Sequence, residues 1–161
     1  MRYFEIKQDI KLRNPIVFEG FEGCPNIVMD REKAQQFKRC VNMYVNGNQE
    51  SQYPDIIQSP ILLISEKLYQ ILQYYDKSVI YKMVILTDLK MRRQDPYRLM
   101  MPTEKEVDDE ITNEDRIFYI KKDGKHHLIV NEDVLESILS RHCIGIVYQQ
   151  VADENSRIKI A

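Results

Sequence analysis

The sequence predicts an α+β fold, with a mostly antiparallel sheet and two amphipathic helices. A strand–helix–strand pattern occurs twice, at residues 59–86 and 126–151. Most other apolar residues fall in short runs bounded by turn residues, which is typical of strands. We expect roughly six to nine strands in total. Strands and helices in these proportions favour an α+β class over a helical bundle.

The first of the two units begins with an apolar run at 61–64, which predicts a short strand. Ser65 then fits the N-cap position, because its hydroxyl can accept a hydrogen bond from an amide of the first helical turn. Glu66 lies at the positive end of the helix dipole. The apolar run at 79–86 predicts the returning strand. The apolar face of the helix consists of Leu68, Ile71, Leu72 and Tyr75.

The second unit repeats this order about 66 residues later. The apolar run at 127–130 is followed by Asn131 as N-cap, and the residues at 143–148 predict the returning strand. An internal duplication and convergence on a common pattern both explain the similarity. The apolar face of this helix is expected to contain Val134, Leu135, Ile138 and Leu139.

The rest of the chain is predicted to form mainly strands and the loops that connect them. Asp30 is a possible cap for a short helix at 31–40, and the polar, turn-rich residues 46–54 predict a surface loop. Asp123 and Gly124 predict a tight hairpin, because both residues tolerate positive φ. Further strands are expected at 2–8, 16–18, 41–45, 97–101 and 117–120.

Composition favours one soluble domain spanning residues 1–161. The chain is 43% hydrophobic and 30% charged, which is ordinary for a globular protein. A formal charge of −2 gives no general attraction to nucleic acid or membranes. No apolar stretch is long enough to span a bilayer, and the strand-like N-terminus does not resemble a secretion signal. Three scattered cysteines indicate no disulfide framework. We therefore expect a cytoplasmic protein.

The sequence predicts no catalytic, cofactor-binding or metal-binding residues. The chain has no glycine-rich phosphate loop, nucleophile elbow, zinc-protease motif or calcium loop. His126 and His127 are neighbours on a predicted strand, so their side chains point to opposite faces. His142 is expected at a helix C-terminus, where a cation interacts favourably with the dipole. Cys143 is interpreted as a small buried residue rather than a nucleophile.

The residues at 103–115 form the most acidic segment of the chain. A solvated charged run is one interpretation, and a mobile loop that complements a basic partner is another. The basic residues Lys90, Arg92, Arg93 and Arg98 could pair with this segment or face a partner. Tyr74 is a further candidate for an interface, since tyrosine combines apolar area with a hydroxyl group. The candidate partner-binding residues are Glu104, Glu106, Asp108, Asp109, Glu110 and Tyr74.

Three short stretches resemble a family of presumed immunity proteins of bacterial polymorphic toxin systems, formerly a domain of unknown function. They are residues 1–6 (MRYFEI), 60–66 (PILLISE) and 128–132 (LIVNE), and the similarity extends over residues 1–151. Asn131 stands where serine is frequent in the family, a change that keeps the capping chemistry. The resemblance implies a cytoplasmic inhibitor that binds a cognate toxin, without catalytic residues.

The sequence therefore leads to one main hypothesis and two alternatives. The main hypothesis is a non-catalytic immunity protein whose partner is a toxin. The first alternative is an enzyme of an unrecognised class that uses His142, Cys143 or the acidic segment. The second is a scaffold or self-assembling protein that uses exposed strand edges. The oligomeric state, the identity of the toxin and the contact surface stay open.

Overall fold

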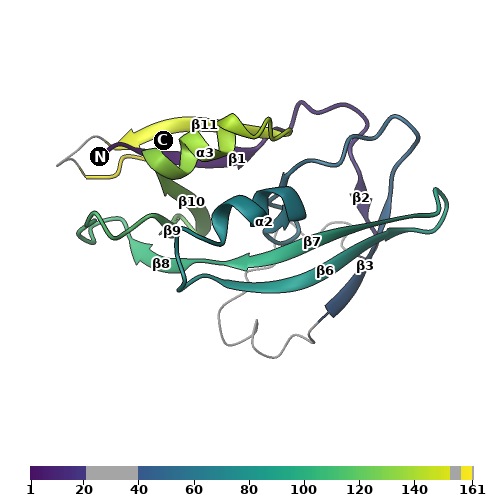
Figure 1. The fold of residues 1–161 in the computed structure, drawn as a ribbon, viewed down its shortest axis with the longest axis horizontal. Helices are drawn as coiled ribbons and strands as arrows, with labels where there is room; N and C mark the ends of the chain where they lie inside the picture. The colour runs from purple at the N-terminus through teal and green to yellow at the C-terminus, as the bar shows by residue number, and fades with distance from the viewer. Residues whose placement is uncertain (21–39, 153–156, 161) are drawn as a thin grey trace.

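The part of the chain that the structure describes consists of two mixed β-sheets and two helices (Figure 1). The computed structural model describes residues 1–20, 40–152 and 157–160. An α+β class is therefore correct. The helices are α2 (Glu66–Leu72) and α3 (Glu132–Ser140).

Sheet 1 has five strands, and its middle strand β10 pairs with β1 and β9. The pairs β11–β1, β1–β10 and β10–β9 are antiparallel, whereas β8 pairs with β9 in parallel. β9 and β10 form the hairpin expected at Asp123 and Gly124, whose φ angles are 54° and 73°. Across the sheet, the strands are β11 (Ile146–Ala152), β1 (Tyr3–Gln8), β10 (Lys125–Asn131), β9 (Ile117–Lys122) and β8 (Thr103–Glu106).

Sheet 2 has six strands, and the long hairpin of β6 and β7 forms its centre. β3 pairs with β6 in parallel, and the other pairs of this sheet are antiparallel. Across the sheet, the strands are β2 (Val17–Phe18), β3 (Cys40–Asn46), β6 (Ile80–Asp88), β7 (Arg93–Met101), β5 (Leu63–Ser65) and β4 (Ile56–Ile57).

Each helix connects two strands that flank a third. β5 and β6, joined through α2, both pair with β7, whereas β10 and β11, joined through α3, both pair with β1. The predicted caps are confirmed, because the Ser65 hydroxyl accepts from the Leu68 amide and Asn131 Oδ1 accepts from the Val134 amide. The duplication itself stays a prediction.

Three apolar clusters hold the described part of the chain together. The first joins both sheets to both helices and includes Ile6, Leu68, Met100 and Ile138. The second lies on the other face of sheet 2. The third lies on the other face of sheet 1, where Ile158 and Ile160 from the C-terminal segment and Val107 and Ile111 from the β8–β9 loop pack on the strands. The clusters thus give each sheet buried residues on both faces.

Asp55 connects the start of α2 to the turn that follows α3. Its buried carboxylate accepts hydrogen bonds from the Ser65 hydroxyl (2.5 Å) and from the Ile144 amide (2.6 Å). Its backbone also pairs with both partners, since the Asp55 amide donates to the Ile144 carbonyl and the Ser65 amide donates to the Asp55 carbonyl, each at 2.9 Å. One residue therefore fixes the cap of α2 against the turn that follows α3.

Several expectations about the elements were wrong. The described residues contain eleven strands rather than six to nine, because short edge strands such as β2 and β4 carry little periodic signal. Leu139 is 47% exposed although it was expected on the apolar face, since α3 buries only one narrow side. β7 begins at Arg93 rather than at 97, because pairing with β6 extends the strand into polar residues.

Two further expectations concern residues 31–54. The helix expected at 31–40 lies in residues that the structure does not describe, except for Cys40, which opens β3. The loop at 46–54 is present, yet Ser51 is buried, and its hydroxyl accepts a hydrogen bond from the Asn48 amide.

We predict that Asp55→Ala lowers the free energy of unfolding by roughly 2–3 kcal/mol, because it leaves the half-buried Ser65 hydroxyl and the Ile144 amide without their acceptor. Urea unfolding measures this change. Asp108→Ala removes an exposed carboxylate and should change the free energy by less than about 0.5 kcal/mol. Equal effects of the two substitutions would contradict the role of Asp55.

Candidate functional site

The acidic residues gather at one edge of sheet 1. Thr103 to Glu106 were expected in a loop but form β8, because each residue pairs with β9. Strand alternation places Glu104 and Glu106 on one face of the sheet and Lys105 on the other. Both glutamates are exposed, and Glu104 Oε2 lies 3.1 Å from His126 Nε2. The site is therefore partly an edge strand rather than a loop alone.

The loop between β8 and β9 is ordered by its own contacts. Asp109 accepts from the Glu106 amide (2.8 Å), and Asp115 accepts from the Thr112 amide (2.7 Å). Lys105 forms an ion pair with Asp115 at 3.2 Å and donates to the Glu110 carbonyl at 3.4 Å. Two carboxylates thus serve the loop itself. The term acidic surface is used below for the exposed carboxylates Glu104, Glu106, Asp108, Glu110 and Glu114.

The basic residues of the β6–β7 hairpin, Lys90, Arg92, Arg93 and Arg98, do not neutralise the acidic surface. The β6–β7 turn and the β8–β9 loop lie at opposite ends of the long axis (Figure 1). Arg93 pairs with Asp95 (2.7 Å), and Arg98 pairs with Glu66 (3.1 Å). Asp88, at the start of the turn, accepts from the Met91 and Gly47 amides, which hold the pKa of its carboxyl below its usual range. The β6–β7 turn is therefore far from the acidic surface, and Arg93 and Arg98 have carboxylate partners of their own.

The tyrosines near α2 divide into packed and exposed side chains. Tyr69 packs edge-on against Tyr81 with ring centroids 4.9 Å apart, and the Arg98 guanidinium lies 4.2 Å from its ring centroid. The Tyr75 hydroxyl lies in hydrogen-bond contact with Ser137 of α3, although Tyr75 follows the end of α2. Tyr74 is 78% exposed, so its side chain is accessible to a partner.

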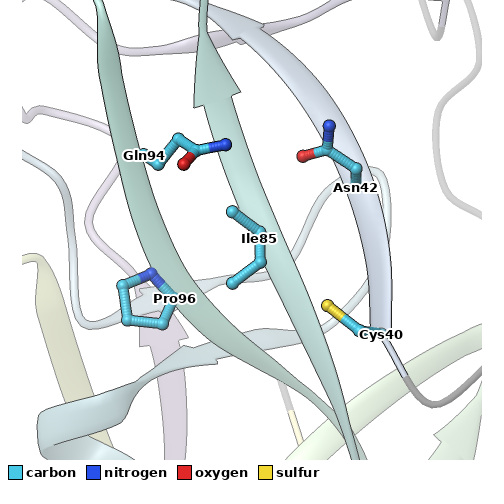
Figure 2. Close-up of a pocket in the computed structure, with 5 residues that line it drawn as sticks. All are labelled: Cys40, Asn42, Ile85, Gln94 and Pro96. Atoms are coloured by element: carbon cyan, nitrogen blue, oxygen red, sulfur yellow. The ribbon is translucent and has the colours of Figure 1, made fainter.

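A shallow hollow lies on sheet 2 across β3, β6 and β7 (Figure 2). Its volume is about 410 Å³. The Thr87 hydroxyl donates to Asn42 Oδ1 (2.5 Å) and accepts from Gln94 Nε2 (3.3 Å), which joins the three strands. β5 pairs with β7 only from Tyr97 onward, so Pro96 occupies a position that needs no amide donor. The lining residues are Cys40, Asn42, Ile85, Gln94 and Pro96.

Sequence patterns did not indicate this hollow, since its side chains come from strands far apart in the chain. Asn42 and Gln94 already use part of their hydrogen-bonding capacity on Thr87. The remaining surface is apolar at Ile85 and Pro96, which suits a flat contact better than a charged ligand.

The histidines and Cys143 are divided between β10 and the turn after α3. His127 Nδ1 lies 2.8 Å from the buried Glu5 carboxylate, whereas His126 contacts Glu104 on the opposite face. His142 follows α3 with a φ of 54°, in the left-handed conformation that often ends helices. Burial, and secondarily Asp55, raise the pKa of the Cys143 thiol to about 11. A thiol with that pKa carries little thiolate near neutral pH.

The described ranges 1–20, 40–152 and 157–160 show neither a metal-binding cluster nor a membrane-spanning helix. Within them, no group of three or more histidine, cysteine, aspartate or glutamate side chains could hold a metal ion. Nor does any helix there have the length and apolar character needed to cross a membrane.

Comparison with known proteins gave no match. No protein-family model matches the chain, and no significant similarity to a curated protein or to a solved structure was found. The resemblance to immunity proteins therefore stays a prediction. Functional inference depends on the surfaces described above.

We predict that Lys105→Met loosens the β8–β9 loop, because the ion pair with Asp115 and the bond to the Glu110 carbonyl are lost. An ion pair of this kind contributes up to about 1 kcal/mol, so protection of the Asp109 and Asp115 amides from hydrogen exchange should fall about fivefold. Lys125→Met, at an exposed lysine beside the hairpin turn, is the matched control. Unchanged protection in both variants would show that Lys105 does not order the loop.

Proposed function

We propose that this chain is a non-catalytic immunity protein that binds and neutralises a cognate bacterial toxin in the cytoplasm. The resemblance of three short stretches to presumed immunity proteins supports the class. The acidic surface supports the mode of action, which is binding through shape and charge. No cofactor takes part in this proposal, and the partner is a protein rather than nucleic acid or a membrane.

The observation that carries the proposal is an acidic surface held in place before any partner binds. Asp109 and Asp115 are used in the turns of the loop, and Val107 and Ile111 anchor it to the third apolar cluster. The remaining carboxylates are exposed on that ordered support. Ordering a flexible loop on binding costs free energy, so a surface that is already ordered binds more tightly for the same contacts.

The position of the basic residues of the β6–β7 hairpin also supports the proposal. The β6–β7 turn, which contains Lys90 and Arg92, lies at the far end of the long axis (Figure 1). Arg93 and Arg98 have carboxylate partners of their own. These basic residues therefore do not compete with a partner for the acidic surface, which can attract a basic patch on another protein. Such complementarity raises association rates and rejects partners of the same charge. A basic cleft that binds phosphate, as in a nuclease, is one surface that these carboxylates would complement.

Tyr74 is the proposed apolar contact. Its side chain is exposed at the end of α2. Tyrosine contributes large contact area at low cost in conformational entropy. We keep Tyr74 as a secondary candidate, because the acidic surface has more side chains in one region.

The product of the adjacent gene is the partner to test, because immunity genes are expected beside their toxins under this proposal. Purified together, the two proteins should form a stable complex with one copy of each. Failure to form a complex, with a neighbour of housekeeping function, would overturn the proposed function.

Within that complex, reversing two charges tests the acidic surface. Glu106→Lys with Asp108→Lys should lower the association rate constant about tenfold or more at low salt, because the carboxylates that steer the partner are lost. Glu50→Lys with Glu136→Lys changes the net charge equally at exposed positions elsewhere. Stopped-flow measurements over a salt series give both rate constants. Equal rates for the two variants would exclude steering by this surface while leaving the complex itself established.

A further inference from the structure

β11 is an edge strand of sheet 1 as the structure describes it. Within the described ranges, β11 pairs with β1 on one side and with no strand on the other. Its sequence, IVYQQVA, contains no charged residue. The backbone groups at the outer side of such a strand are available to pair with another strand. The accessible part is its first half, because the register shifts near Tyr3 and Phe4 and the Lys159 amide donates to the Val151 carbonyl (2.9 Å).

The other described sheet edges are protected. β8, at the opposite end of sheet 1, carries Glu104, Lys105 and Glu106 among its four residues. The edge strands β2 and β4 of sheet 2 have two residues each. Charged side chains and short length are both devices that prevent edge-to-edge pairing. β11 has neither of them.

Apolar side chains are also exposed around the start of β11. Ile144 and Val147 are each 43% exposed, and Tyr148 is 50% exposed. Ile10, which is 93% exposed, belongs to the same region because the neighbouring Asp9 amide donates to the Gly145 carbonyl at 2.8 Å. A group of exposed apolar residues beside an unpaired edge indicates an interface for another polypeptide.

We propose that β11 pairs antiparallel with β11 of a second copy of this chain, joining two copies of sheet 1 into one continuous sheet. The pairing is symmetric, so the same patch is used by both copies. The main-chain groups at 146–149 supply the hydrogen bonds, and the side chains of Ile10, Ile144, Val147 and Tyr148 supply the apolar contact. This interface uses the edge opposite to β8, so the acidic surface stays open in the dimer.

The charges of the edge strands favour a second copy of this chain as the partner that pairs with β11. Because β11 is uncharged, no antiparallel register of the strand with its copy places like charges opposite each other. A symmetric pairing of β8 about Lys105 would place the two lysines together. Pairing of β11 with β8 of another copy would place Glu104, Lys105 and Glu106 beside the uncharged residues of β11. Among the described edge strands longer than two residues, pairing of β11 with itself is the combination that leaves no charge unpaired.

Sedimentation velocity of the purified chain alone, from low to high micromolar concentration, tests the proposal. We expect the wild type to form dimers. Val147→Lys should raise the equilibrium dissociation constant of the dimer about tenfold or more, because the lysines of both copies then lie in the interface. Val17→Lys is the matched control, since Val17 is 53% exposed on the edge strand β2 of the other sheet. This control should dimerise like the wild type.

Hydrogen exchange of the wild type provides a readout that needs no variant. Amides at 146–149 should exchange more slowly as the concentration rises, and amides of β8 should not change. A wild type that stays monomeric at all concentrations, or dimers that Val147→Lys does not weaken, would overturn the proposal. So would a monomer whose β11 edge becomes protected only on binding the adjacent gene product. Neither experiment with the chain alone depends on toxin binding.

Discussion

The fold depends on the hydrogen bonds that Asp55 makes at the junction of the two sheets. Its carboxylate accepts from Ser65 at the start of α2 and from Ile144 in the turn after α3. The neighbouring Pro54 carbonyl accepts from the buried Tyr97 hydroxyl at 2.6 Å. Gly145 has a φ of 74°, and a Cβ there would lie 2.5 Å from the Pro54 Cβ. A buried carboxylate, a proline and a glycine therefore determine how the two units meet.

This junction determines which surfaces remain outside. With α2 and α3 packed in the cluster shared by both sheets, the outer edges of sheet 1 are left to β8 and β11. One edge is charged and is followed by a loop that Lys105 orders, and the other is uncharged and exposes Val147 and Tyr148. Two edges of one sheet thus offer two kinds of contact, which suits a protein that acts through association.

Local chemistry made much of the fold predictable. Ser65 and Asn131 cap helices because a short polar side chain there satisfies an amide, and the Asp123–Gly124 hairpin follows from positive φ. Asp55 was missed, because a lone aspartate after proline carries no periodic signal and its partners lie 10 and 89 residues away. β8 was missed because charged residues in alternation look like a loop until β9 pairs with them. Of the candidate contacts, the sequence located the acidic residues, whereas the hollow and the open edge required the arrangement of strands.

The central claim is that the acidic surface, ordered in advance, is the part of this protein that meets its partner. Hydrogen exchange of the chain with and without the adjacent gene product tests that claim directly. The account predicts slower exchange on binding at β8 and the following loop, while β2 and the β6–β7 turn stay unchanged. Slower exchange confined to the hollow of sheet 2 or to the β6–β7 turn, with β8 unaffected, would contradict it.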